Sequence, residues 1–394
     1  MKMHVDTTLI DATRHILSVI RDHNAETERE RRLSRATLHA LTDAGLLRMC
    51  TPHSLGGLEV DPLTCARVVE EVAGADSAAG WTLVNPLNYA FFCARLSDAG
   101  AEEIYRNGPD ALIAGPFHPP IQATPAAGGY RLTGRASFAS NCHDATWIAR
   151  VAMVMDGDTP RLNASGTPAL LLALVPVEAC DIIDTWYVMG MRGTGSDDIA
   201  LTDVFVPQAR TFPLEPAFTP GSHYRGPLYQ FSAMGNLAST FPLVMLAMAR
   251  QALNEVYTLA QGKIPFASTT VLGERATAQV KLAQAEATLR AARALLYDTL
   301  GVMWEQTLAG EPPSLVQRAD LLLATAHATS SAAQVVELAY SVAGTSGIYT
   351  RNPLERHFRD VQVLKQHGFA SEHRYETVSQ VYFGLPPEFA PVAL

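Results

Sequence analysis

The sequence predicts an α+β protein that is mainly α-helical, with helical regions at both ends and β-strands in the middle. Three observations predict this class. Apolar residues recur at helical spacing in roughly the first 110 positions, short apolar segments separated by glycine and proline follow, and long runs of strong helix formers fill the C-terminal part. These changes of pattern divide the 394 residues into three predicted domains, at residues 1–110, 111–215 and 216–394.

The N-terminal domain is predicted to be helical from the spacing of its apolar residues. Leu33, Leu38 and Leu41 fall on one face of a helix, and Gly45 can end that helix. A mostly buried helix is expected from Trp81 to Cys93, because most residues there are apolar.

The central domain is predicted to consist of short strands. Tyr130, Leu132 and Phe138 alternate with polar neighbours, as in a strand with one buried face. Short strands separated by turns at this spacing predict a small β-sandwich or barrel. Further strands are expected at residues 147–154, 169–175 and 199–206.

The C-terminal domain is predicted to be a bundle of longer helices. Residues 276–308 and 315–342 consist largely of strong helix formers, and the Pro312-Pro313 pair separates the two stretches. Helices of this length pack side by side, so an antiparallel bundle is expected.

Composition and charge exclude several classes of protein. Hydrophobic residues make up 48% of the chain and charged residues 18%, which predicts a globular protein with a large core. The net charge of −9 comes without a basic block, so neither a nucleic acid nor an anionic membrane surface is expected as a partner. No apolar run approaches the roughly 18 residues of a membrane span. The five scattered cysteines lack metal-ligand spacing, so no metal is expected, and they favour a reducing, cytoplasmic compartment.

A glycine-rich segment at residues 190–196, Gly-Met-Arg-Gly-Thr-Gly-Ser, allows two interpretations. It lacks the lysine of a nucleotide triphosphate loop and leads into a strand, which argues against a site of that kind. One interpretation is a tight turn between strands. The other is a ligand loop, in which the glycines let backbone N–H groups approach a flat or anionic ligand while Arg192 and Ser196 supply donors.

Residues 134–147 bring an aromatic, a hydroxyl and an amide side chain together at the end of a predicted strand. A structural turn explains this segment as well as a site does. A flat ring system such as flavin needs an apolar contact and polar groups along one edge. The side chains that could supply them are Phe138, Ser140, Asn141 and Trp147.

Residues 353–367 place several ionisable groups in an otherwise apolar bundle. A structural ion-pair network is expected from Glu355, Arg356, Arg359 and Asp360. His367 follows this group, and the ordinary pKa of a histidine, about 6.5, suits acid–base work at cellular pH.

Five segments together resemble the acyl-CoA dehydrogenase superfamily, and within it the two-component flavin-dependent monooxygenases known as group D hydroxylases. The resemblance to this branch rests on His367, which follows the Arg359-Asp360 pair where the dehydrogenases use a glutamate at or near this point. The implied fold has an N-terminal helical domain, a central β-sandwich or barrel and a C-terminal antiparallel helical bundle. The five segments are residues 41–57, 70–81, 128–147, 186–207 and 353–367.

The resemblance implies an oxidoreductase that uses reduced flavin from a separate NAD(P)H:flavin reductase. The reduced flavin would react with O₂ to form a C4a-hydroperoxyflavin, which oxygenates a small aromatic, heterocyclic or amine substrate. Reduced, diffusible FMN is the expected cofactor, with FAD as the alternative. The resemblance also implies a homotetramer that is built as a dimer of dimers.

Roles for individual residues follow from the same resemblance. His367 is expected to act as the base or proton donor, and Ser140 is expected to bond near flavin N5 or the peroxide. Further flavin contacts are expected from Phe138, Asn141, Trp147, Arg192, Gly193, Thr194 and Ser196. Phosphate contacts across a subunit boundary are expected from Lys263 and Arg275, and substrate contacts from Trp81, Asn85 and Asn88.

Two other functions stay open from the sequence. A flavoenzyme that oxidises a CoA thioester, like the acyl-CoA dehydrogenases, would need a carboxylate base, for which Glu355 and Glu372 are the nearby candidates. A scaffold of the same fold without catalytic activity would bind flavin in neither redox state. His143 and Asp144 also depart from the monooxygenase pattern, in which a histidine often occupies the second of these positions.

Overall fold

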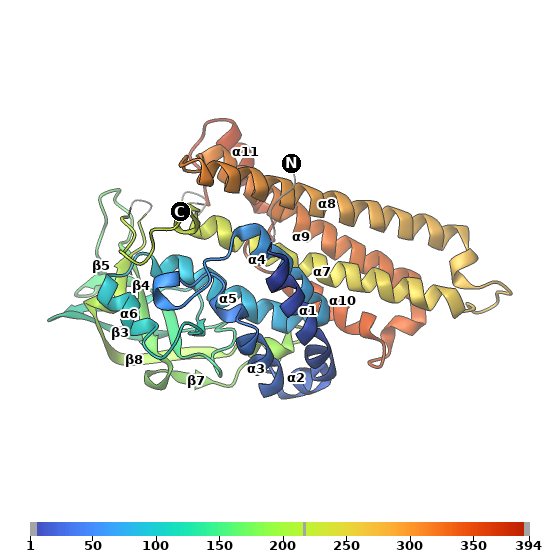
Figure 1. The fold of residues 1–394 in the computed structure, drawn as a ribbon, viewed down its shortest axis with the longest axis horizontal. Helices are drawn as coiled ribbons and strands as arrows, with labels where there is room; N and C mark the ends of the chain where they lie inside the picture. The colour runs from blue at the N-terminus through green and yellow to red at the C-terminus, as the bar shows by residue number, and fades with distance from the viewer. Residues whose placement is uncertain (1–5, 216–217, 390–394) are drawn as a thin grey trace.

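The computed structural model describes residues 6–215 and 218–389, and in it a sheet and a long helical bundle lie at opposite ends of the molecule, with shorter helices between them (Figure 1). None of the helices in this described part is long and apolar enough to span a membrane. The N-terminal helices are α1 (Thr7–Asp22), α2 (Asn24–Glu30), α3 (Arg35–Asp43), α4 (Pro62–Ala75), α5 (Ser77–Cys93) and α6 (Asp98–Ile104).

A single residue, Asp76, separates α4 from α5 and sets the direction of α5. Its backbone is extended, with φ −154° and ψ 126°, and its carboxylate accepts a hydrogen bond from the Ala79 N–H at 2.9 Å. An aspartate at this position satisfies one of the free N–H groups at the start of a helix. α5 therefore begins at a fixed point, and the mostly buried helix that the sequence predicts from Trp81 to Cys93 is confirmed.

Nine strands form one hydrogen-bonded sheet with the order β7-β8-β3-β2-β4-β6-β9, to which β1 and β5 add by pairing with β4. The pairs β1/β4 and β2/β4 are parallel and the others are antiparallel. The predicted alternation through Phe138 ends early, because β3 stops at Ala136. The strands are β1 (Ile113–Ala114), β2 (Ile121–Ala126), β3 (Gly129–Ala136), β4 (Trp147–Asp156), β5 (Thr159–Pro160), β6 (Leu170–Pro176), β7 (Asp181–Ile183), β8 (Asp198–Pro207) and β9 (Thr211–Pro213).

The C-terminal helices form the predicted bundle, in which α7, α8 and α9 run side by side (Figure 1). α8 has the bounds that the sequence predicts, and α9 extends one residue further than predicted. Ser314 and Gln317 form a reciprocal capping box at the start of α9. The helices are α7 (Ala233–Gly262), α8 (Ala276–Leu308), α9 (Leu315–Ala343), α10 (Pro353–Leu364) and α11 (His373–Tyr382).

The two helical regions share one hydrophobic core, whereas the strands enclose a smaller core of their own. α4 and α5 both pack against α7, whose residues Phe241, Leu243 and Val244 are completely buried. A helix that is apolar on nearly all sides, like the first half of α7, belongs inside a protein. The N-terminal helices are therefore held between the sheet and the bundle.

Candidate active site

Two loops meet at one edge of the sheet, because β3 and β8 are antiparallel neighbours with Ala136 opposite Ile199. The loop after β3 contains residues 137–146, and the loop before β8 contains residues 184–197. The Ala139 N–H donates to the Asp197 carbonyl at 3.0 Å, and the Asn141 N–H donates to the Thr194 carbonyl at 2.8 Å. The two motifs that the sequence left ambiguous thus form one structure.

The loop after β3 has an unusual backbone at two residues. Phe138 has φ +69° and Asn141 has φ +64°, which lie in the left-handed backbone region that residues other than glycine seldom adopt. The turn leaves the Phe138 ring 66% exposed, with its edge against Trp186 at 6.0 Å between centroids, and directs Ser140 into the protein, where it is 8% exposed. Backbone strain of this kind is frequent at functional sites.

The glycine-rich segment forms a single 3₁₀ turn from Arg192 to Thr194 rather than a phosphate-binding loop. The structure gives Gly193 a packing role, and its predicted contact with flavin stays a prediction. A Cβ atom at this position would lie 2.3 Å from Thr27 Cγ2 and 2.9 Å from Ala78 Cβ. Only glycine lets this turn approach α2 and α5 so closely.

We expect Gly193→Ala to lower the free energy of unfolding by about 1–3 kcal/mol, because the new methyl group overlaps buried atoms of α2 and α5. Urea unfolding measures this change. Gly262→Ala is the matched control, since Gly262 is the last residue of α7 and nothing lies within 4 Å of an added Cβ there. Equal stability of the two variants would contradict the packing role of Gly193.

Four side chains from α5 and the two loops form a continuous row of hydrogen bonds. The Trp81 Nε1–H donates to Ser140 Oγ at 2.9 Å, and Ser140 Oγ lies 2.7 Å from Ser196 Oγ. Ser196 Oγ lies in turn 2.6 Å from Thr194 Oγ1. The row ends at the Met191 carbonyl, which accepts from Thr194 Oγ1 at 2.8 Å. Trp81, Ser140, Thr194 and Ser196, all expected at the site, are therefore brought together.

His367 lies beside the same tryptophan, in a group of aromatic rings from three parts of the chain. Its ring stacks on Phe241 of α7 with 4.5 Å between centroids, meets the Trp81 ring edge-on at 5.5 Å and lies 5.8 Å from Phe369. Its Nδ1 accepts from the Phe369 backbone N–H at 3.4 Å, so a neutral imidazole keeps its proton on Nε2. Burial lowers the pKa of His367 to about 4. The imidazole is therefore neutral at cellular pH.

His367 and His357 predict a dependence of stability on pH. Burial also lowers the pKa of His357 to about 4, although Asp360 and Asp76 nearby oppose the shift. Between pH 4 and the ordinary histidine pKa of about 6.5, the unfolded chain binds more protons than the folded chain, so acid favours unfolding. We expect each histidine to remove roughly 1–2 kcal/mol of stability between pH 7 and pH 5. Urea unfolding at both values, on wild type and on the double variant His357→Gln and His367→Gln, checks this slope, which the variant should flatten.

An ion-pair network lies beneath the site, as the sequence predicts. Arg359 forms two bonds to the Glu355 carboxylate, at 2.5 and 3.1 Å. The Arg356 guanidinium lies 2.8 Å from Asp76 and 3.4 Å from the buried carboxylate of Asp360. Asp360 also accepts the Met191 N–H at 2.6 Å, so the network fixes the residue at which the hydroxyl row ends.

Neither candidate carboxylate base for thioester oxidation is free at the aromatic group. Glu355 is engaged by Arg359, and Glu372 is exposed next to the start of α11. The dehydrogenase alternative therefore lacks the base that it needs at this position.

The remaining predicted site residues divide into two sets. The Asn85 amide donates to the Ser140 carbonyl at 3.3 Å, which places Asn85 at the site. Asn88 instead joins α5 to α7, because it exchanges hydrogen bonds with Asn236 and Thr240 inside the core. Trp147 begins β4 and donates to the Ile104 carbonyl at 3.2 Å, so its contacts are structural. Arg192 is near Glu28, with 3.9 Å between the charged groups.

Lys263 and Arg275 lie far from the aromatic group in the same chain. Lys263 follows the last residue of α7, 22 positions after Phe241, which corresponds to roughly 33 Å along a helix. Its ammonium group donates to the Ala343 carbonyl. Arg275 is exposed at the start of α8. Neither residue can reach a flavin that touches Ser140 of its own chain.

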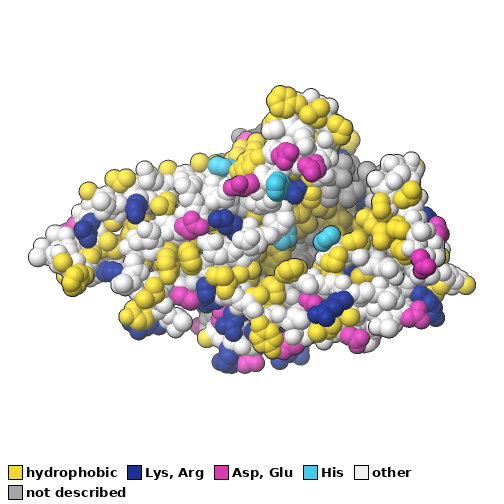
Figure 2. Space-filling model, turned by 180° about the vertical axis from the view of Figure 1, so that it is seen from behind, with side chains coloured by type: hydrophobic (Ala, Val, Ile, Leu, Met, Phe, Trp, Pro, Cys, Tyr) yellow, Lys and Arg dark blue, Asp and Glu magenta, His cyan; other side chains and the backbone are white. Residues whose placement is uncertain are grey.

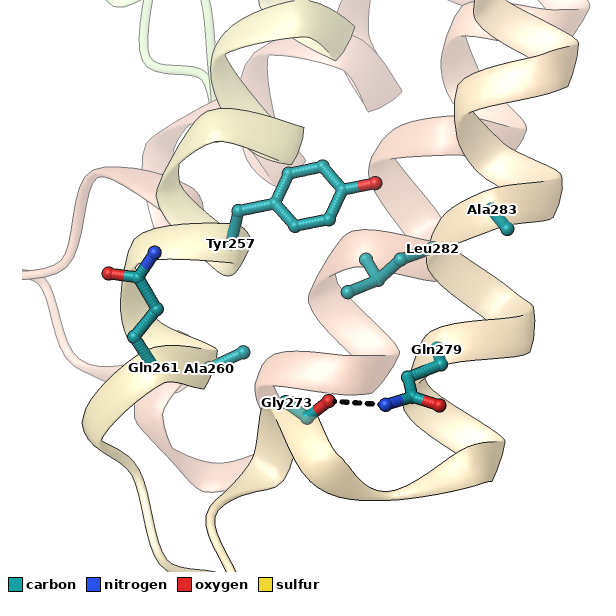
Figure 3. Close-up of a pocket in the computed structure, with 7 residues that line it drawn as sticks. All are labelled: Tyr257, Ala260, Gln261, Gly273, Gln279, Leu282 and Ala283. Atoms are coloured by element: carbon teal, nitrogen blue, oxygen red, sulfur yellow. Dashed lines mark hydrogen bonds between the residues drawn. The ribbon is translucent and has the colours of Figure 1, made fainter.

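A hollow of about 300 Å³ also lies at that far end, between α7 and α8 (Figure 3). Tyr257 and Leu282 point into it from the two helices. Its position near the end of α7 separates it from the aromatic group, so it is no part of the site. The lining residues are Tyr257, Ala260, Gln261, Gly273, Gln279, Leu282 and Ala283.

The residues at the meeting point of the loops fit a flavin ring. Ser140 Oγ retains a free lone pair, and the Asn141 amide nitrogen is buried without a hydrogen-bond partner in the part of the chain that the structure describes. The exposed Phe138 ring offers an apolar face. The space-filling view shows a hollow between the bundle and the β-region, bordered by hydrophobic and histidine side chains (Figure 2). A flat group with polar atoms along one edge matches these features.

Two family models match the chain. Residues 8–107 match "Acyl-CoA dehydrogenase, N-terminal domain", and residues 239–372 match "Acyl-CoA dehydrogenase, C-terminal domain". The chain is also 32% identical to an indole-3-acetate monooxygenase of Pseudomonas putida, over 94% of this chain and 93% of that protein. The chain belongs to the monooxygenase branch of the acyl-CoA dehydrogenase superfamily.

A second curated relative and one solved structure agree with the assignment. The FADH₂-dependent resorcinol hydroxylase, oxygenase component, of Rhizobium sp. (strain MTP-10005) is 26% identical, over 98% of this chain and 96% of that one. The structure of XiaF from Streptomyces sp. in complex with FADH₂ and glycerol has a TM-score of 0.88 and 25% identity, and covers 97% of this chain and 96% of that one. The sequence-based expectations of this fold, of a flavin-dependent monooxygenase and of a reduced flavin cofactor are confirmed.

Proposed function

We propose that this monooxygenase oxygenates a small aromatic substrate of the indole or phenol class, and that His367 and Ser140 carry the reaction. The observation that carries this proposal is the neutral, half-buried imidazole of His367 beside the indole of Trp81, which itself donates to Ser140. Trp81 therefore links a proton-bearing group of the chain, His367, to Ser140, the residue that fits a flavin edge. O₂ and a small molecule are the other reactants.

The chain's own residues divide the work as follows. A bound reduced flavin supplies the electrons that activate O₂ and the site at which one oxygen atom is passed on. The Nε2–H of His367 donates to an acceptor atom of the substrate and stabilises the charge that develops there. The Phe241 ring, which is completely buried, and the Phe369 ring pack against His367 and shield it from water. The half-buried indole of Trp81 offers an apolar face to an aromatic substrate. Ser140 and Asn85, which are joined by a hydrogen bond, orient the polar edge of the flavin.

The names of relatives narrow the substrate class. Proteins at 32% and 30% identity are named indole-3-acetate monooxygenase, and the Rhizobium protein acts on resorcinol. The described contacts of the aromatic group include no charged partner for His367, which favours an uncharged ring over a charged one. We therefore propose an indole as the first candidate substrate and a phenol as the second.

Product analysis with a flavin reductase, NADH, FAD and O₂ tests the substrate class. Indole, indole-3-acetate and resorcinol are supplied separately, and the amount of oxygenated product is compared with the amount of H₂O₂. Product from an indole at high yield supports the proposal, and product from resorcinol alone would move the substrate to the phenols. If all three yield only H₂O₂, the aromatic class is wrong.

We also propose FAD as the working flavin and a homotetramer, a dimer of dimers, as the working assembly. FADH₂ is named for the Rhizobium hydroxylase and in the XiaF complex. Lys263 and Arg275 can serve a flavin phosphate only from a second copy of the chain, because they lie too far from Ser140 of their own chain. Light scattering should give about four times the 42.5 kDa of one chain, and a monomer would contradict the proposal.

The partner enzyme and the compartment complete the proposal. A separate NAD(P)H:flavin reductase supplies the reduced flavin, as the oxygenase component of a two-component system requires. A cytoplasmic location suits this chemistry because all five cysteines are free thiols.

A further inference from the structure

The direction of every hydrogen bond in the row from Trp81 to Met191 is determined by the chemistry of its two ends. The Met191 carbonyl can only accept, so the hydroxyl of Thr194 must donate to it. The indole N–H of Trp81 can only donate, so Ser140 Oγ must accept from it. All three hydroxyl residues are at most 8% exposed, so water does not offer them other partners readily.

The hydroxyl protons between these ends then have one arrangement. Thr194 donates its only hydroxyl proton to the Met191 carbonyl, so Ser196 must donate to Thr194 Oγ1 across 2.6 Å. Because the Ser196 hydroxyl proton is used in that hydrogen bond, Ser140 must donate to Ser196 Oγ across 2.7 Å. The Asp360 carboxylate, which accepts the Met191 N–H at 2.6 Å, holds the residue whose carbonyl ends the row.

Ser140 is left with a single open position, and that position is a lone pair. Its proton is committed to Ser196 and one lone pair is committed to Trp81, so Ser140 Oγ can offer a ligand only an acceptor. The N5 atom of a flavin carries a hydrogen when the flavin is reduced and only a lone pair when it is oxidised. An acceptor that faces N5 therefore pairs with the reduced state and opposes the oxidised state.

We propose that the one-way row of hydrogen bonds through Trp81, Ser140, Ser196 and Thr194 makes this protein select reduced over oxidised flavin. The proposal rests on the proposed function, because it requires a flavin at Ser140. It assigns Ser196 and Thr194, which are buried behind Ser140, a positioning role in choosing the redox state. Such selection lets the protein take reduced flavin from a reductase and release it after oxidation.

Thr194→Val tests the proposal because it removes one hydroxyl, two hydrogen bonds away from Ser140 and three from the ligand, and nearly preserves the shape of the side chain. Without Thr194 Oγ1, the Ser196 proton can turn towards Ser140, and the Ser140 proton can then turn towards the flavin. The dissociation constants of oxidised FAD in air and of reduced FAD under anaerobic conditions are measured by fluorescence or absorbance titration. Thr194→Ser keeps the hydroxyl and is the matched control.

We expect wild type and Thr194→Ser to bind reduced FAD about tenfold or more tighter than oxidised FAD. The open lone pair of Ser140 Oγ accepts a hydrogen bond from the N5–H of reduced FAD, but it faces another lone pair on N5 of oxidised FAD. Thr194→Val should bring this ratio close to one, mainly by tightening the binding of oxidised FAD. Ser196→Ala should act in the same way. For a two-electron couple, a tenfold loss of selection lowers the midpoint potential of bound FAD by about 30 mV.

Three results would contradict the proposal. An unchanged ratio in a folded Thr194→Val protein would show that Ser140 does not choose the redox state, while the proposed function would stand. A ratio near one in wild type would have the same meaning. If wild type bound FAD in neither state, both this proposal and the proposed function would be wrong.

Discussion

Replacing His367 with alanine should lower the yield of oxygenated product per NADH by on the order of 100-fold, while the flavin is still oxidised by O₂. The Nε2–H of His367 is a hydrogen-bond donor within the aromatic group, separate from the Trp81 N–H that donates to Ser140, and the imidazole is neutral at cellular pH because burial lowers its pKa to about 4. Without it, the electrons should appear as H₂O₂ instead of product. Product and H₂O₂ are measured together in the same reaction with the reductase.

Two further variants separate the role of His367 from general effects. His373→Ala removes an exposed histidine at the start of α11 and should leave the yield unchanged. His367→Gln keeps an N–H donor and should recover part of the yield if the histidine works as a donor rather than as a base. Product yield at the wild-type level in His367→Ala would show that the histidine is structural.

The second large effect is expected for Asp360→Ala, which should lower the free energy of unfolding by about 3–5 kcal/mol. Asp360 is completely buried, accepts from Met191 N–H and Ser77 Oγ, and lies 3.4 Å from Arg356. Its loss leaves part of the charge of the half-buried Arg356 uncompensated and releases the N–H of Met191, whose carbonyl ends the hydroxyl row. Urea unfolding measures the change.

Asp156→Ala is the matched control for this variant. Asp156 pairs with Arg161 at 2.7 Å, but both side chains are exposed, so we expect a loss below about 1 kcal/mol. A loss of the same small size for Asp360→Ala would show that the network beneath the site is dispensable.

The helices could be predicted from the sequence because their signals are local. α8 and α9 consist of strong helix formers with a proline pair between them, and no distant contact is needed to define their bounds. The sheet could be predicted only as a set of strands. Alternation shows that a strand has a buried face, but it does not state which strand pairs with which, and the parallel pairing of β2 with β4 follows from no pattern in the sequence.

The site could be predicted only in pieces, because its parts lie far apart in the chain. Ser140 and Ser196 belong to separate motifs, and only the pairing of β3 with β8 brings them together. Phe241 was not predicted, since one apolar residue in a buried helix looks like any other. A tryptophan near a loop fits a ring contact with flavin as well as it fits a structural role, and in the structure the Trp147 indole donates a hydrogen bond to the Ile104 carbonyl.

A single-turnover reaction with isotopically labelled O₂ tests the central claim most directly. The protein is mixed under anaerobic conditions with a limiting amount of reduced FAD and an excess of an indole substrate, and labelled O₂ is then added. We predict one labelled oxygen atom in the product for nearly every reduced flavin, and much less label in the product of His367→Ala. Wild type that reoxidises the flavin without placing label in any product would contradict the claim that this chain is a monooxygenase of aromatic substrates.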